Sequence, residues 1–386
     1  MEKREQLFAE LPEALVEEML SRSEQVGAML HDSLVEILNN KDKMRKQLEE
    51  GGLLRRDTDV GYPSIPTTCG VDGSYAVERL LATDFVACAA VAIEGLTPPS
   101  EKRYWEKPHH RVFIQSERHD PDTSTVIRGL MMEMEVELAV EAPHDIVFLD
   151  GSLTTPLIYM NQAINKVLQW QKEDISFHVS EELIKRFKDF LKFYKDILES
   201  SRTDKLWVGM PKYTARRELG KMLNWSSHYD DRAILTTILS PGEFTSPVPL
   251  EKPQQQWHLR LPDEDKELER LRNEVLSAID RLYVIYYRPH NWTPVFRIEI
   301  ASSIASSIAT NNSRLAVLLQ GVKYQSGTPG IMEPYPLYIA DRMVKHLGRA
   351  IPAFRQTATR RMTELHQGDI GEIFFSMHGY RTESGR

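Results

Sequence analysis

The chain has 386 residues, of which 41% are hydrophobic and 27% charged, and its formal net charge at pH 7 is -8. This length suits one large domain with insertions or two ordinary domains. The negative charge excludes a protein that is basic throughout, so any nucleic-acid contact needs a local cluster of Lys and Arg. Cys69 and Cys88 are the only cysteines, which is too few for a disulfide framework and fits a reducing cytoplasm.

The first 50 residues are predicted to be helical. Apolar residues, beginning with Leu7 and Phe8, recur there at helical spacing, and a charged run ends in Gly51 and Gly52, which favour a helix end. We therefore divide the chain into an N-terminal helical segment, 1–55, expected to make dimer or partner contacts, and a main domain, 60–386. The longest apolar run, 85–96, is too short to span a bilayer and is better explained as a buried strand.

The main domain alternates between strand and helix patterns. Strands are predicted at 67–74, 85–95, 109–117, 145–153, 206–212, 281–289 and 295–300. Helices are predicted at 123–142, across an insertion near 156–202, within a second insertion near 252–280, and from about Leu337, after Pro334 and Pro336. Strands that alternate with helices indicate an α/β fold with a sheet covered by helices.

The tripeptide Asp-Gly-Ser occurs twice, at Asp72 and at Asp150, each time at the end of an apolar run. If the two strands are neighbours, their carboxylates converge, and a divalent cation would remove the repulsion between them. Ligands that are all oxygen favour Mg²⁺ or Mn²⁺ over zinc. The plainer interpretation is that Asp-Gly-Ser is a turn sequence in both places.

A third acidic candidate lies on the helix predicted at 123–142. Glu133, Glu137 and Glu141 form a stripe with a spacing of four residues, which is typical of a solvated face. Glu135 instead has apolar neighbours three and four residues away, so its carboxylate needs a partner. That partner is either a metal or a cation such as Arg128, and Glu133 is the reserve candidate.

At this point the chain resembles the NurA nucleases. The resemblance rests on the order of VDGS, a helix that carries glutamates, LDGSL, VGMPK, FRIEI and YPLYIADR, over roughly residues 60–350. It implies a ribonuclease H-like mixed sheet flanked by helices, with an N-terminal helical extension and helical insertions. It also implies a homodimeric, Mn²⁺- or Mg²⁺-dependent deoxyribonuclease that works with a HerA-like hexameric ATPase in DNA end processing, DNA repair or antiviral defence.

The resemblance also implies a set of metal ligands. The family's two aspartates match Asp72 and Asp150, its helix glutamate matches Glu135 or Glu133, and its late ligand falls on Asp341. Two positions depart from the family pattern: Asp341 stands where a histidine is frequent, and Glu333 stands where an aromatic residue is frequent. His346 is a further candidate acid or phosphate contact, or an ordinary surface histidine.

The strand predicted at 206–212 ends in a basic loop. The resemblance assigns Lys212 to DNA, and Arg216 and Arg217 follow it beside Tyr213, a combination suited to gripping a phosphate backbone. A solvated basic surface is the alternative. Two serines, Ser74 and Ser152, could donate hydrogen bonds to a phosphate or orient a carboxylate. Arg297 could line the cleft or form a buried ion pair with Glu299 two residues on.

The predicted reaction is phosphodiester hydrolysis by a two-metal mechanism. The sequence contains no GxSxG nucleophile motif, and it has no Walker A run, so translocation along DNA would need a partner ATPase. The competing hypothesis is a non-catalytic subunit that clamps DNA or regulates the ATPase. A lysine or arginine filling the gap between Asp72 and Asp150 would argue against the metal site.

Overall fold

The computed structural model describes residues 11–225, 229–263, 265–307 and 313–378. Within these residues the strands form one mixed sheet in the order β1-β7-β9-β10-β6-β5-β2-β3-β4, with β8 paired to β9. The strands are β1 (Leu54–Arg56), β2 (Thr68–Arg79), β3 (Asp84–Glu94), β4 (His109–Glu117), β5 (Ile146–Asp150), β6 (Leu206–Met210), β7 (Glu243–Thr245), β8 (Val248–Pro249), β9 (Leu282–Arg288) and β10 (Phe296–Ala301).

Half of this sheet has the ribonuclease H-like arrangement. The strands β2, β3 and β4 form an antiparallel meander, and β5 and β6 lie parallel to β2 on its other side. Numbered along the chain, this is the order 3-2-1-4-5. The sheet then continues through β10 and β9, both in antiparallel pairings. The predicted mixed sheet flanked by helices is therefore confirmed.

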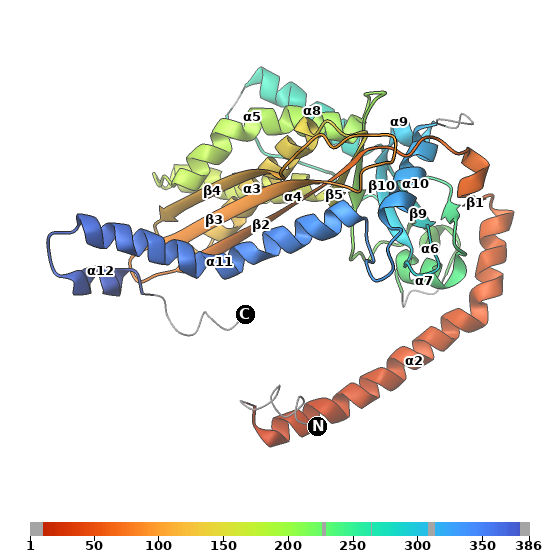
Figure 1. Ribbon diagram of the computed structural model, residues 1–386, viewed down its shortest axis with the longest axis horizontal. Helices are drawn as coiled ribbons and strands as arrows, with labels where there is room; N and C mark the ends of the chain where they lie inside the picture. The colour runs from red at the N-terminus through yellow and green to blue at the C-terminus, as the bar shows by residue number, and fades with distance from the viewer. Residues whose placement is uncertain (1–10, 226–228, 264, 308–312, 379–386) are drawn as a thin grey trace.

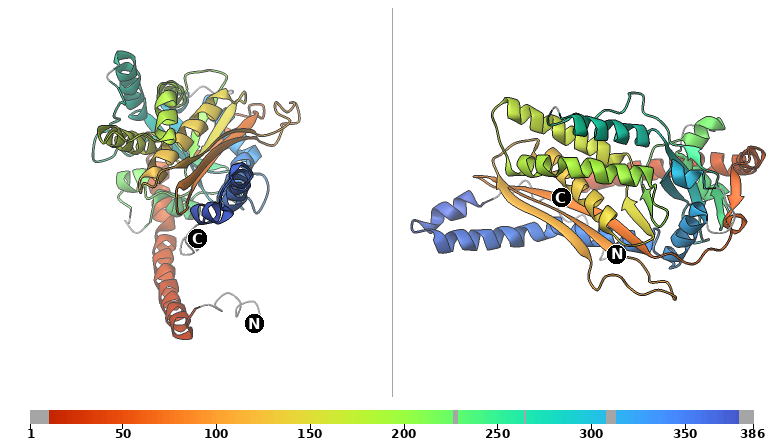
Figure 2. Two further views of the ribbon diagram at one scale, coloured as in Figure 1. Left: turned by 90° about the vertical axis from the view of Figure 1, so that its left-hand side faces the viewer. Right: turned by 90° about the horizontal axis from the view of Figure 1, so that it is seen from above.

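Helices cover both faces of the sheet (Figures 1 and 2). The helices α3 (Thr123–Glu141) and α11 (Tyr335–Leu365) both pack on β2 and β3, from opposite sides. Outside α3 lie α4 (Thr155–Lys172) and α5 (His178–Glu199), and α8 (Lys266–Ile279) packs on α5. The shorter helices are η1 (Asp57–Val60), α6 (Glu218–Met222), α7 (Asp231–Ile238), α9 (Ser302–Ala305), α10 (Arg314–Gln325) and α12 (Ile370–Ser376).

The largest apolar core lies between the sheet and the layer formed by α3, α4 and α5. Most of α3 is buried, because it is enclosed by strands on one side and by two helices on the other. A second core, on the side of β5, β6, β9 and β10 that faces α10, includes Phe148, Ile298 and Leu319. The functional residues described below lie where α3 and α11 approach β2 and β5.

The N-terminal helix α2 (Glu13–Glu50) extends away from the body of the protein (Figure 1). Only its last turns are anchored, through Ile37, Met44 and Leu48 and through an ion pair of 2.7 Å between Arg45 and Glu243. The predicted helix 1–50 thus agrees with the structure over the residues described, while Leu7 and Phe8 lie outside them.

One predicted strand has different bounds in the structure, and several elements were missed. The strand predicted at 67–74 continues to Arg79, because β2 pairs with β3 from Cys69 to Arg79, so Asp72 lies inside a strand and not at its end. Several short elements, among them β1, β7, α6, α7 and α10, were not predicted.

None of the helices in the described part of the chain combines the length and the hydropathy needed to span a bilayer.

Candidate active site

Three aspartates from distant parts of the sequence meet in space. Asp72 lies in β2, Asp150 ends β5, and Asp341 lies in the second turn of α11; one carboxylate oxygen from each lies within 4.8 Å of the other two. The two Asp-Gly-Ser copies come together because β2 and β5 are parallel neighbours with Val71 opposite Leu149. The expected convergence therefore occurs, although only β5 ends at its aspartate. Such a set of oxygen ligands could hold a hard divalent cation.

Asp341 reaches this cluster because α11 rests directly on the backbone of β2. A Cβ atom built on Gly70 would lie 2.6 Å from the Leu337 amide nitrogen and 2.6 Å from the Pro336 carbonyl carbon. Glycine at this position therefore permits the close approach of helix and strand. The prolines at 334 and 336 begin the helix, with Pro336 in its first turn.

Glu135 approaches the cluster from the opposite face of the sheet. Its side chain is buried between α3 and β2, where a Cβ on Gly73 would lie only 2.4 Å from the Glu135 Oε1 atom. Burial, with the negative charges of Asp72 and Asp150, raises the pKa of Glu135 well above its ordinary value. Glu135 is not one of the three side chains whose oxygens lie within 4.8 Å of one another.

Glu133, the reserve candidate, faces elsewhere. Its Oε2 atom is 3.3 Å from Nη1 of Arg186 on α5, and burial raises its pKa to about 7. The glutamate stripe was predicted to be solvated, which holds for Glu141, exposed at the end of α3, but is wrong for Glu133. Glu133 is 2% exposed, and Glu137 and Glu141 both pair with Arg111 of β4. Of the two helix glutamates, the structure brings only Glu135 to the aspartates.

The surroundings of Asp72 perturb its carboxyl group. Burial, together with the negative charge of Asp150, raises the pKa of Asp72 to about 7. The charges of Lys212 and the hydrogen bond of 2.8 Å from the Gly73 amide act in the opposite direction. A cluster of this kind is stabilised by positive charge, whether from a metal ion or from a side chain.

Lys212, on the loop after β6, supplies such a charge. Its Nζ atom lies 2.7 Å from Asp150, 2.9 Å from Glu333 and 3.5 Å from Asp341. Burial lowers its pKa, but these carboxylates outweigh burial and raise it above the ordinary value. Arg232 fixes the loop by donating hydrogen bonds to the carbonyl oxygens of Lys212 and Val295.

A lysine or arginine between Asp72 and Asp150 was expected to argue against a metal site, and Lys212 lies close to both residues. Lys212 pairs with Asp150 and Asp341, but no ion pair joins it to Asp72 among the described residues. A salt-bridged lysine therefore lies at the acidic cluster and its charge also acts on Asp72, so the condition for rejecting the metal site is met in part. A second lysine, Lys345, contacts Asp341 at 2.6 Å from an exposed position on the next turn of α11.

The other predicted phosphate contacts lie in different surroundings. Arg216 donates a hydrogen bond to the carbonyl oxygen of Glu251, and Arg217 donates one to the carbonyl oxygen of Trp225, so both side chains contact other segments of the chain. The Ser152 hydroxyl donates a hydrogen bond of 2.6 Å to Glu299, so Ser152 stabilises the loop after Asp150. Ser74 is partly buried on β2, on the same side of the strand as Asp72.

Arg297 is a buried residue that is linked through Glu299 to the loop after Asp150. Its guanidinium pairs with Glu218 at 2.7 Å and with Glu299 at 3.1 Å, and it also donates to the Tyr286 hydroxyl. Glu299 in turn accepts hydrogen bonds from Ser152 and from the Leu153 amide. Of the two interpretations of Arg297, the structure shows the buried ion pair.

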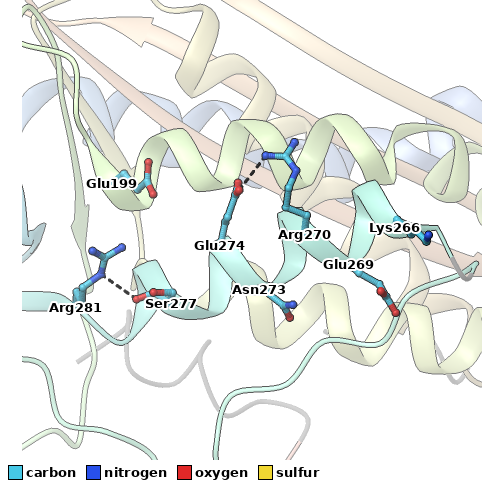
Figure 3. A pocket seen from close by; sticks show the side chains of 8 residues that line it. All are labelled: Glu199, Lys266, Glu269, Arg270, Asn273, Glu274, Ser277 and Arg281. Atoms are coloured by element: carbon cyan, nitrogen blue, oxygen red, sulfur yellow. Dashed lines mark hydrogen bonds and ion pairs between the residues drawn. The ribbon is translucent and has the colours of Figure 1, made fainter.

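His346 and one surface hollow remain apart from the aspartates. His346 is exposed on α11. The hollow, shown in Figure 3, lies along α8 beside α5, and Glu274 spans it through contacts with Arg270 and Lys195. None of the residues that line this hollow belongs to the acidic cluster.

Comparisons with known proteins identify the family and the fold. The model of the NurA domain matches residues 66–346. A comparison with curated protein sequences finds no match. The crystal structure of the NurA nuclease from Sulfolobus solfataricus matches with a TM-score of 0.55 and 16% identity, covering 88% of this chain and 98% of that one. A crystal structure of NurA with manganese matches with a TM-score of 0.53 and 12% identity, covering 89% of this chain and 99% of that one. The chain therefore belongs to the NurA domain family.

Proposed function

We propose that this protein is a Mn²⁺- or Mg²⁺-dependent deoxyribonuclease that hydrolyses phosphodiester bonds in the cytoplasm. The observation that carries the proposal is the convergence of Asp72, Asp150 and Asp341 from two strands and a helix. Unpaired carboxylates at this distance repel one another, so the arrangement is stable only with positive charge beside it. A related NurA structure contains manganese, and the ligands here are oxygen atoms that suit the same ion.

The residues divide the work by position. Asp72, Asp150 and Asp341 would hold the metal, and Glu135 would complete its surroundings from beneath the sheet. When bound, divalent ions lower the pKa of a coordinated water and stabilise the leaving oxygen, which is the two-metal mechanism. Lys212 lies beside the aspartates, where its ammonium group can contact the phosphate, while the predicted contributions of Arg216, Arg217 and Ser74 would lie along the DNA backbone.

Cleavage of linear DNA with Mn²⁺, with and without EDTA, tests this function. The Asp150→Asn variant removes a ligand charge while keeping the shape of the side chain, and we expect it to abolish cleavage. The matched control is Asp280→Asn, because Asp280 is exposed and, among the described residues, forms an ion pair only with the exposed Lys252, at 3.7 Å. Cleavage that persists in Asp150→Asn, or in EDTA, would refute the assignment of the site.

The runner-up function is a non-catalytic subunit that clamps DNA or regulates a partner ATPase. One observation favours it: Lys212 already neutralises two of the three aspartates without a metal. In that case the wild-type chain and Asp150→Asn would bind DNA equally well, and both would lack cleavage even with the ATPase present.

The proposed partners are a second copy of the chain and a HerA-like hexameric ATPase. The exposed face of α2 is the proposed dimer contact, because Leu15, Met19, Met29 and Leu30 recur on it at helical spacing and are 43–69% exposed. We expect Met29→Glu to shift the protein from dimer to monomer in sedimentation analysis. Asn39→Glu, on an exposed polar position of the same helix, is the control. A dimer that survives Met29→Glu would exclude this surface.

A further inference from the structure

Lys212 and the candidate metal site share the same carboxylates. The Lys212 ammonium group lies 2.7 Å from the Asp150 Oδ2 atom and 3.5 Å from the Asp341 Oδ1 atom, and both residues belong to the acidic cluster. A divalent cation bound to Asp72, Asp150 and Asp341 would therefore lie within a few ångströms of a fixed positive charge. Like charges at such a distance repel strongly in a partly buried site. The lysine and the metal cannot both keep their full set of contacts.

Glu333 provides Lys212 with a third contact that is not shared. Its Oε2 atom is 2.9 Å from the Lys212 Nζ atom, and among the described residues Lys212 is its only ion-pair partner. Glu333 lies just before α11 and is 18% exposed. It is placed to keep Lys212 when the aspartates release it.

We propose that Lys212 is an internal counter-cation that competes with the divalent ion for Asp150 and Asp341, and that Glu333 is the positioning residue that retains Lys212 when the metal displaces it. This inference rests on the proposed function, because it concerns the same metal site. In the metal-free protein Lys212 neutralises the aspartates. In the metal-bound protein it stays beside them, paired with Glu333 alone, with its remaining N–H groups free to contact a phosphate.

The first experiment measures Mn²⁺ affinity by following the electron paramagnetic resonance signal of free Mn²⁺. Lys212→Met removes the competitor, and we expect it to bind Mn²⁺ at least about tenfold more tightly than the wild-type chain. Lys345→Met is the matched control: Lys345 also contacts Asp341, at 2.6 Å, but is 71% exposed, so solvent screens its charge and we expect a change of less than about threefold.

The second experiment measures how accessible the Lys212 ammonium group is in the metal-free and metal-bound states. Acetylation of Lys212 by a water-soluble reagent is followed by mass spectrometry, with and without saturating Mn²⁺. We expect wild-type Lys212 to stay protected in both states, because Glu333 holds it. In Glu333→Gln we expect Lys212 to become acetylated several times faster, and only when Mn²⁺ is bound. Thermal denaturation of each variant verifies that the fold is intact.

The outcomes separate the two proposals. Equal Mn²⁺ affinity for the wild-type chain and Lys212→Met would overturn the competition while leaving the nuclease proposal standing. Equal protection of Lys212 in Glu333→Gln and the wild-type chain would overturn the role of Glu333. If neither the wild-type chain nor Lys212→Met binds Mn²⁺, the metal site itself fails, and the proposed function falls with it.

Discussion

The substitution Arg297→Met tests whether the buried ion pairs beneath the aspartates hold the site together. Arg297 is 1% exposed, and its guanidinium donates to Glu218 at 2.7 and 2.8 Å and to Glu299 at 3.1 and 3.2 Å. Methionine fills a similar volume but donates no hydrogen bond. Two carboxylates would then be left in the core without their cation.

The expected loss of stability in Arg297→Met depends on the hydrogen bonds that Glu218 and Glu299 keep. Breaking a buried ion pair by removing one partner costs about 3–5 kcal/mol, because the other charge stays desolvated. Glu299 keeps its hydrogen bonds from Ser152 and Leu153, and Glu218 keeps its hydrogen bond from Tyr286. These contacts soften the loss, so we expect the free energy of unfolding to fall by about 3 kcal/mol.

Urea denaturation followed by circular dichroism measures this loss. The control is Arg270→Met, because Arg270 is 60% exposed and pairs with Glu274 at the surface, where the expected change is below about 1 kcal/mol. Adding Glu218→Gln to Arg297→Met should restore part of the stability, since one uncompensated charge is removed. If Arg297→Met costs no more than Arg270→Met, the ion pairs do not stabilise the region and the reasoning is wrong.

Three further predictions concern the site and the rim of the sheet. Gly73→Ala places a methyl group 2.4 Å from the Glu135 carboxylate, so we expect a stability loss of about 1–3 kcal/mol and weaker Mn²⁺ binding. The control is Gly348→Ala inside α11, where nothing lies within 4 Å; it should leave Mn²⁺ binding unchanged and raise stability by up to about 1 kcal/mol, because alanine favours the helix. The hydrogen bond of 2.7 Å to Asp84 raises the pKa of His119 above 6.5, so this pair adds stability that is fully present below pH 6.5 and is lost as the pH rises through the raised value. Denaturation of His119→Asn across this range should therefore show a deficit at acidic pH alone, and a deficit at alkaline pH would contradict the linkage. Finally, saturating Mn²⁺ should stabilise the chain by about 2.7 kcal/mol at one hundred times its Kd, and EDTA should reverse the effect; an unchanged melting temperature would count against a metal site.

The convergence of Asp72 and Asp150 could be predicted because it depends on local signals. Apolar runs mark the two strands, and parallel neighbours bring equivalent positions together. The burial of Glu135 also followed from its apolar neighbours along the helix. The length of β2 could not be predicted, because Asp72, Gly73 and Ser74 have turn propensity, which the eleven-residue pairing with β3 overrides.

Other features depend on partners that are far away in sequence. On the glutamate stripe of α3, Glu133 is buried and Glu137 is partly buried beside Arg186 and Arg111, which come from α5 and β4. Glu218 belongs to a five-residue helix that is too short to give a periodic signal. Its ion pair with Arg297 therefore could not be predicted from the sequence. The position of Asp341 came from family resemblance, and its contact with Lys212 emerges only from the fold.

Gly70 has a consequence for how this protein can diverge. Helix α11 touches the strand where Gly70 has no side chain, so even one added methyl group would lift the helix and carry Asp341 away from its companions. Such a variant would keep all its carboxylates, so its sequence alone would suggest a complete metal site. In this architecture a metal centre can be dismantled by gaining atoms at a position with no chemistry of its own.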